Sequence, residues 1–175
     1  MKRRTVLALI AAAFAPAAFA PAAFADRPKR AAATYRIYSR NHEYFADINA
    51  EIQRTVVYAV DRSGRPVPLW EIPGWFRVAM LSNDGASLVT GYDGSNLLDQ
   101  GFSPEDIMLT FYHRGRLTTV IRLKELVADP GKLPSTVSHW RWGEYLGFDE
   151  VNRFQVKTVE GKLLSFDPVT GKRLD

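Results

Sequence analysis

Residues 55–72 read TVVYAVDRSGRPVPLWEI, a β-branched run that ends at a glycine-containing turn and continues into a second apolar run. The same order of strand, turn and strand returns in IMLTFYHRGRLTTVIRL at residues 107–123 and in FQVKTVEGKLLSFDPVTGKRL at residues 154–174. Short apolar runs bounded by glycine, asparagine and aspartate are typical of antiparallel strands joined by hairpin turns. These three segments therefore predict an all-β fold.

The spacing of the turns indicates a repeat. The turn residues Gly64, Gly115 and Gly161 are 51 and 46 residues apart, a period similar to that of propeller blades. A further hairpin precedes each of them, at residues 38–48, 80–90 and 142–154. One blade would comprise two such hairpins and so four strands. We therefore expect about three four-stranded, propeller-like blades that form an open or partial propeller, with an antiparallel β-sandwich or meander as the alternative.

A resemblance to a known family supports the propeller interpretation. Residues 161–174, GKLLSFDPVTGKRL, resemble the blade segment of bacterial quinoprotein-type β-propellers, in which a Gly-led strand is followed by an aspartate and a Thr-Gly turn. Ser82-Asn83-Asp84-Gly85, followed by Leu88-Val89, is similar to the inner hairpin of many exported propellers. The chain departs from the family in its blade count, because closed propellers have four to eight blades. We expect an open arc, a stack of sheets, or half of a ring that a partner completes.

The N-terminus predicts an export signal. The basic residues KRR at 2–4 precede an Ala-rich apolar run at 6–24, and AFA at 23–25 provides a small-x-small cleavage site. Two prolines interrupt the run, which disfavours a membrane-spanning helix. We expect residues 1–25 to be a cleaved signal peptide, residues 26–33 a flexible lead-in, and residues 34–175 a single all-β domain in the periplasm or outside the cell, with no integral membrane segment after cleavage.

The paired arginines of this signal also resemble a twin-arginine export signal. The residue before the pair is lysine instead of the usual serine or threonine, so the general secretory route is favoured. The net charge of +4 comes from the same region, since residues 1–33 carry six basic residues and one acidic residue. Residues 34–175 carry 17 basic and 18 acidic residues without a Lys/Arg run, which argues against nucleic-acid binding.

Several kinds of chemistry are disfavoured by the residue types present. The chain has no cysteine, which excludes disulfides, a thiol nucleophile and Cys-type zinc sites. Its three histidines, His42, His113 and His139, show no metal-ligand spacing, so we expect no metal and no cofactor. Ser138 and His139 are adjacent, and because adjacent strand residues point to opposite faces, we do not expect them to share a proton.

Two segments are the best candidates for a ligand-binding surface. The first is the loop at residues 91–106, GYDGSNLLDQGFSPED, and the second is residues 138–143, SHWRWG. Alternation would place the two tryptophans of the second segment on one face of a strand and its histidine and arginine on the other. The favoured interpretation is that the tryptophans pack in the core. The candidate ligand-binding residues are Tyr92, Asp93, Asn96, His139, Trp140, Arg141 and Trp142.

Two functional hypotheses follow from these patterns. The first is an exported binding or assembly module without a catalytic site, which acts through protein or small-ligand contacts and has a second copy or an envelope protein as partner. The second is a periplasmic hydrolase or lyase with a cleft at the 91–106 loop, for which Asp93, His139 and Arg141 would have to converge.

Overall fold

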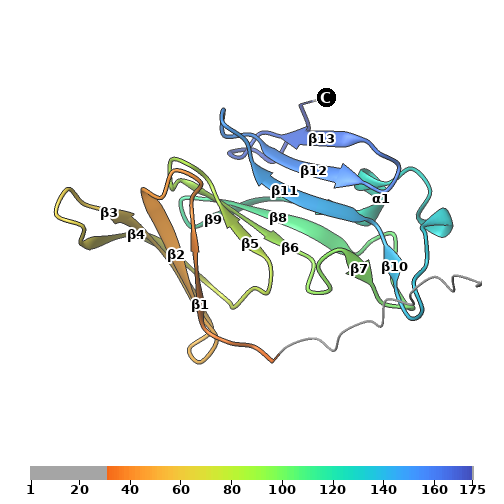
Figure 1. Ribbon diagram of the computed structural model, residues 1–175, viewed down its shortest axis with the longest axis horizontal. Coiled ribbons are helices and arrows are strands. Elements are labelled where there is room, and N and C mark those ends of the chain that lie inside the picture. The colour runs from red at the N-terminus through yellow and green to blue at the C-terminus, as the bar shows by residue number, and fades with distance from the viewer. Residues whose placement is uncertain (1–30, 175) are drawn as a thin grey trace, which may run out of the picture.

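The computed structural model describes residues 31–174, so the predicted signal peptide and residues 26–30 of the predicted lead-in lie outside the described residues. The described chain is all-β, as predicted, and its strands form several small antiparallel sheets, none of which closes into a barrel (Figure 1). No helix among the described residues is both long enough and apolar enough to cross a membrane.

Three of the sheets are meanders that follow one another along the chain. The N-terminal sheet has the order β1 (Tyr35–Tyr38), β2 (Tyr44–Asn49), β3 (Arg54–Val60) and β4 (Pro66–Pro73). The middle sheet has the order β5 (Ala79–Leu81), β6 (Ser87–Gly91), β8 (Ile107–His113) and β9 (Arg116–Arg122). The C-terminal sheet has the order β11 (Gly143–Phe148), β12 (Phe154–Thr158) and β13 (Leu163–Phe166).

The end of the C-terminal sheet differs from the predicted repeat in detail. Arg173 bridges to Phe166, and the Leu174 amide donates to the Ser165 carbonyl at 2.9 Å, so these residues lie at the position of a fourth strand. Gly64 and Gly115 lie between the third and fourth strands of their sheets, whereas Gly161 lies between the second and third strands of its sheet. The glycine turns of these hairpins look alike in sequence, which is why spacing alone did not distinguish the two positions.

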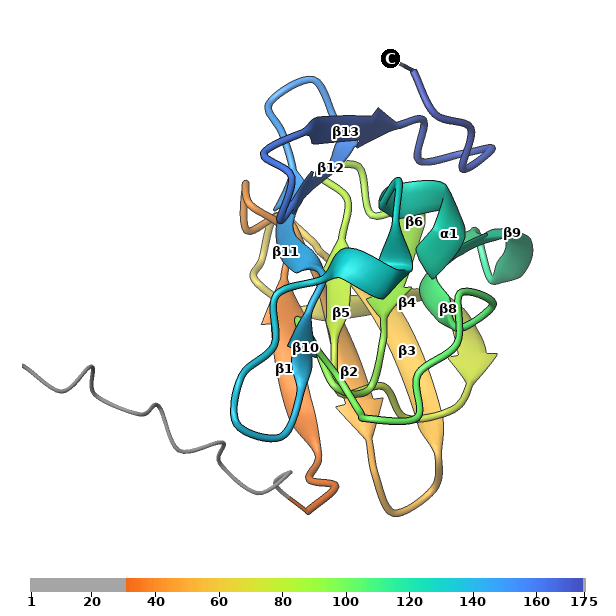
Figure 2. The same cartoon turned by 90° about the vertical axis from the view of Figure 1, so that its right-hand side faces the viewer.

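The three meanders are stacked with the middle sheet between the other two (Figures 1 and 2). Apolar residues of the N-terminal and middle sheets form one buried cluster, namely Ala46, Val57, Ile72, Leu81 and Leu88. A larger cluster joins the middle sheet to the C-terminal sheet and includes Val89, Leu109, Phe111, Phe154, Val156 and Phe166. Since successive residues of a strand face opposite sides, Leu88 and Val89 of β6 face different clusters, and both are fully buried.

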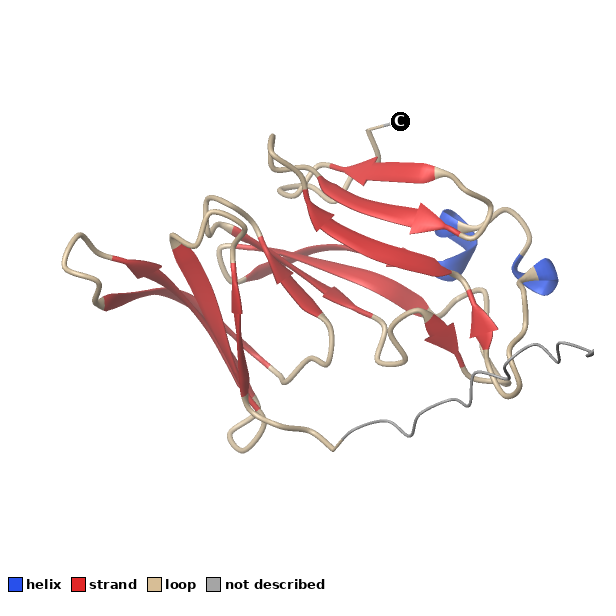
Figure 3. Ribbon diagram, in the orientation of Figure 1, coloured by secondary structure: helices blue, strands red, loops and turns tan. Residues whose placement is uncertain are grey.

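Little of the described chain is helical (Figure 3). The short helix α1 (Leu123–Leu126) follows β9 and places Leu123 and Leu126 in the larger cluster, and the 3₁₀ turn η1 (Pro130–Lys132) follows it. A two-stranded ribbon of β7 (Leu97–Leu98) and β10 (Trp140–Arg141) lies outside the three meanders.

The first strands of the three sheets meet around one groove. Strands β1 and β11 both contact β5, and the groove of about 450 Å³ between the three strands is lined by residues of each, including Ile37, Met80 and Phe148. The turns that follow these strands are also connected, because Asn41 donates to the Asn83 carbonyl at 2.8 Å and the Asn83 amide donates to Asn152 at 2.8 Å. This arrangement is consistent with a partial propeller and with the sandwich alternative.

Candidate functional site

The structure brings the two candidate segments together. Strands β7 and β10 pair in antiparallel register, with Trp140 opposite Leu98 and Arg141 opposite Leu97. The ribbon therefore joins the 91–106 loop to residues 138–143. The pairing connects positions more than forty residues apart and could not be inferred from local sequence.

The two tryptophans are part of the core, which agrees with the favoured interpretation. The Trp142 side chain is fully buried, and its Nε1 donates to the Ser95 carbonyl at 2.8 Å. Its ring lies 5.0 Å from that of Tyr145 in an edge-to-face arrangement. Trp140 is partly buried and contacts the ring of Phe102 at 6.1 Å. The Trp142 ring is therefore closed to a ligand, whereas Trp140 also lines an open hollow of about 360 Å³.

The 91–106 loop is held to the core by hydrogen bonds. The Tyr92 amide donates to the hydroxyl oxygen of Tyr145 at 2.8 Å, and that hydroxyl donates to the Met108 carbonyl at 3.2 Å. Burial raises the pKa of Tyr145 far above its ordinary value. The Asn96 carbonyl accepts from the Trp142 amide at 3.3 Å. At these positions the loop is therefore packed against the core and held there by hydrogen bonds.

The three residues proposed for a hydrolase or lyase site have separate partners. Asp93 forms an ion pair with Arg77 at 3.0 Å, and the Nε2 of His139 lies 3.4 Å from a carboxylate oxygen of Asp99. Arg141 is exposed and lines a hollow described below.

The expectation that Ser138 and His139 would point apart is wrong. The Ser138 Oγ lies 3.0 Å from the His139 Nδ1. The expectation assumed a strand, but residues 137–138 form a bend and β10 begins only at Trp140, so the alternation rule does not apply. Together with Asp99 these side chains form a hydroxyl–imidazole–carboxylate chain beside an open hollow of about 360 Å³.

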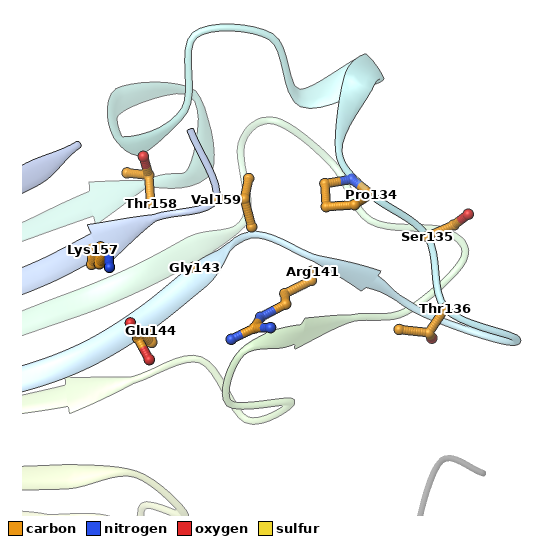
Figure 4. A pocket seen from close by; sticks show the side chains of 9 residues that line it. All are labelled: Pro134, Ser135, Thr136, Arg141, Gly143, Glu144, Lys157, Thr158 and Val159. Carbon is orange, nitrogen blue, oxygen red and sulfur yellow. The ribbon is translucent and has the colours of Figure 1, made fainter. Parts of the chain in front are cut away.

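A larger hollow of about 480 Å³ lies where β10 leads into the C-terminal sheet (Figure 4). Its charged lining residues are Arg141, Glu144 and Lys157, and Ser135 and Thr136 lie on the opposite side. Within residues 31–174, the side chains of these three charged residues form no ion pair with one another or with other groups.

Glu144 and Lys157 belong to the face of the C-terminal sheet that points away from the middle sheet. They are directly opposite one another on β11 and β12, and Leu163 of β13 is opposite Lys157. Their neighbours along the strands, such as Val156 and Leu164, face the core. We call the set Glu144, Lys157 and Leu163 the C-terminal outer face. Leu163 is 50% exposed.

The N-terminal sheet has a corresponding outer face, formed by Arg36, Tyr38, Phe45, Asp47, Tyr58 and Val60. The rings of Phe45 and Tyr58 stack at 4.9 Å, and Tyr38 lies 6.0 Å from Phe45. Arg36 covers Phe45 at 4.0 Å and binds Asp47 through two hydrogen bonds of 2.6 and 2.8 Å. Tyr38 is 51% exposed and Val60 is 39% exposed, whereas Phe45 is only 4% exposed because Arg36, Tyr38 and Tyr58 of the same face pack around its ring. We call this set the N-terminal outer face.

Sequence reasoning missed both outer faces. The alternation of Tyr38, Phe45 and Tyr58 with core residues is visible in the sequence, but which face is covered depends on the order in which the sheets stack.

Among the described residues no group of three His, Asp or Glu side chains could hold a metal ion. No family model matches the chain, and no curated protein matches it.

Proposed function

We propose that the protein is an exported binding or assembly module that acts through protein contacts on its two outer faces. One observation carries the proposal: apolar clusters pack on both faces of the middle sheet, with only the edge strand β9 left largely exposed, whereas the N-terminal and C-terminal sheets each pack against another sheet on one face only. The uncovered sides combine exposed apolar residues with charged residues, a composition that suits protein interfaces.

Export is part of the proposal and rests on the predicted signal peptide at residues 1–25. Contacts in the periplasm or outside the cell would use the folded part of the chain, whose charge is close to neutral. A nearly neutral surface with an aromatic ridge favours short-range apolar contacts over long-range electrostatic attraction.

Site-specific photo-cross-linking in the cells that produce the protein tests the proposal. We expect p-benzoylphenylalanine at Val60 or at Leu163 to give protein adducts after irradiation. The matched control is the same substitution at Leu117, which is 59% exposed on β9 of the middle sheet. If neither outer-face position gives an adduct, or if all three give the same adducts, the proposal is wrong.

The second candidate is a periplasmic hydrolase or lyase at the 91–106 loop. The observation that favours it is the Ser138–His139–Asp99 chain, since a serine beside a base that a carboxylate orients is the usual design of a serine nucleophile. Labelling of Ser138 by a fluorophosphonate, lost in Ser138→Ala and retained in Ser135→Ala, would support this candidate.

A further inference from the structure

We infer that the partner of the outer faces is a second copy of this chain, bound head to tail, so that two copies form a closed ring of six sheets. The inference rests on the proposed function and specifies its partner. In such a ring the C-terminal outer face of each copy covers the N-terminal outer face of the other.

The two contacts inside the molecule show how such a stack is built. The N-terminal sheet packs on one side of the middle sheet, and the C-terminal sheet packs on the other. In both contacts the first strands are neighbours, β1 beside β5 and β5 beside β11. A second copy that places its C-terminal sheet on the N-terminal outer face would continue the same order of sheets, with its β11 next to β1.

The number of sheets favours two copies. Three sheets lie in an arc around the groove formed by β1, β5 and β11. Two arcs supply six sheets, which is within the range of four to eight blades that closed propellers contain. A head-to-tail contact that closes after two copies leaves neither outer face exposed, whereas one that does not close produces a growing filament.

The two outer faces are chemically complementary. The N-terminal outer face has an aromatic ridge flanked by the Arg36–Asp47 pair. The C-terminal outer face has the apolar Leu163, the unpaired charges of Glu144 and Lys157, and the hollow of about 480 Å³ beside them. Glu144 can face an arginine and Lys157 a carboxylate across such a contact, so no like charges need to be buried together.

The area covered can be estimated from the smaller of the two sheets. The C-terminal sheet has three strands of about five residues each and measures about 14 Å by 17 Å, which is roughly 240 Å² in projection. Each copy takes part in two such contacts, which is roughly 480 Å² in projection, and the accessible area lost is larger because side chains interdigitate. This area approaches the ~800 Å² per partner of a standard interface.

Analytical ultracentrifugation of the purified mature protein and three arginine variants tests the inference. We expect the wild type to sediment as a dimer, and Val60→Arg and Leu163→Arg each to raise the dimer Kd by about 100-fold or more, because each variant places an unpaired charge in both contacts of the ring. Leu117→Arg is the matched control and should remain dimeric. Near-ultraviolet circular dichroism of the three variants verifies that each is folded.

Mixing the two outer-face variants tests the head-to-tail geometry. Val60→Arg retains an intact C-terminal outer face and Leu163→Arg an intact N-terminal outer face, so the mixture should form a dimer with one good contact. If only one of the two variants dissociates, the contact joins identical faces and the inference is wrong. A wild type that forms growing polymers also overturns the closed ring.

The same measurements separate this inference from the proposed function. If the wild type is monomeric while the Val60 and Leu163 photo-adducts contain a different protein, the second-copy inference is wrong and the proposed function stands. If the adducts have twice the mass of the mature chain, both are supported. If no outer-face adduct forms and the wild type is monomeric, both are wrong.

Discussion

Gly85 shows how a single residue fixes two sheets against each other. It lies in the turn between β5 and β6 with a φ of +66°, and its carbonyl accepts from the Trp70 Nε1 of the N-terminal sheet at 2.9 Å. A Cβ at this position would overlap the ring of Tyr44, which also belongs to the N-terminal sheet. The Asp-Gly sequence predicted the turn, but the close approach of a neighbouring sheet is what excludes every other residue.

Gly85→Ala should therefore destabilise the protein more than an ordinary turn substitution does. We expect a loss of about 2–4 kcal/mol in the free energy of unfolding, from the left-handed backbone and the overlap with Tyr44 together. The control is Gly64→Ala, where φ is +80° and the space around the Cβ is open, so the loss should be about 1 kcal/mol. Urea denaturation measures both, and equal losses would contradict the role of the Tyr44 contact.

At the scale of elements, the turns that begin with aspartate share one design. The carboxylate of Asp167 accepts from the Thr170 amide at 2.7 Å and from the Val169 amide at 3.0 Å. Asp61 and Asp149 hold their turns in the same way, each accepting from the amide of the arginine four residues later. The Thr170 amide is the main cause that lowers the pKa of Asp167, and partial burial opposes it.

This design predicts a pH-dependent contribution to stability. Because the pKa of Asp167 is lower in the folded state, its carboxylate stabilises the protein above the unfolded-state value of about 3.9, and this contribution disappears as the pH falls through the folded-state pKa. Asp167→Asn should lower the free energy of unfolding at pH 7, and the difference from wild type should shrink below pH 4. Urea denaturation across this pH range measures it, and Glu51→Gln, whose exposed carboxylate holds no such turn, should show no comparable loss. A difference that stays constant with pH would contradict the prediction.

The predictable and unpredictable elements differ in how far their contacts reach along the chain. The hairpins joining β3 to β4 and β8 to β9 were predicted because the turn residues and the flanking strands are adjacent in sequence. The β7–β10 ribbon was missed because its strands have two residues each and pair across more than forty residues. The bend at Ser138 was missed for a related reason: the following strand is too short for its alternation to extend to residue 138.

For the candidate site, prediction from the sequence fails at the level of whole sheets. The sequence predicted that Trp140 and Trp142 serve the core, because large aromatic residues in alternation suit burial. It could not predict that Tyr38, Phe45 and Tyr58 lie on an uncovered face. Alternation shows that a strand has two faces, but only the stacking order shows which of them another sheet covers.

At the scale of the whole molecule, a ring of two copies would make thermal stability depend on protein concentration. The dimer is stabilised by mass action, and a tenfold rise in concentration contributes RT ln 10, about 1.4 kcal/mol, shared by two copies. For a chain of this size we expect the Tm to rise by about 2 °C per tenfold increase. The Tm of Leu117→Arg should rise equally, and the Tm of Val60→Arg and Leu163→Arg should not change with concentration. Scanning calorimetry over a hundredfold range of protein concentration measures this dependence of the Tm. A wild-type Tm that does not change with concentration would contradict the ring, because it would show that a single copy unfolds alone, stabilised only by its own two apolar clusters.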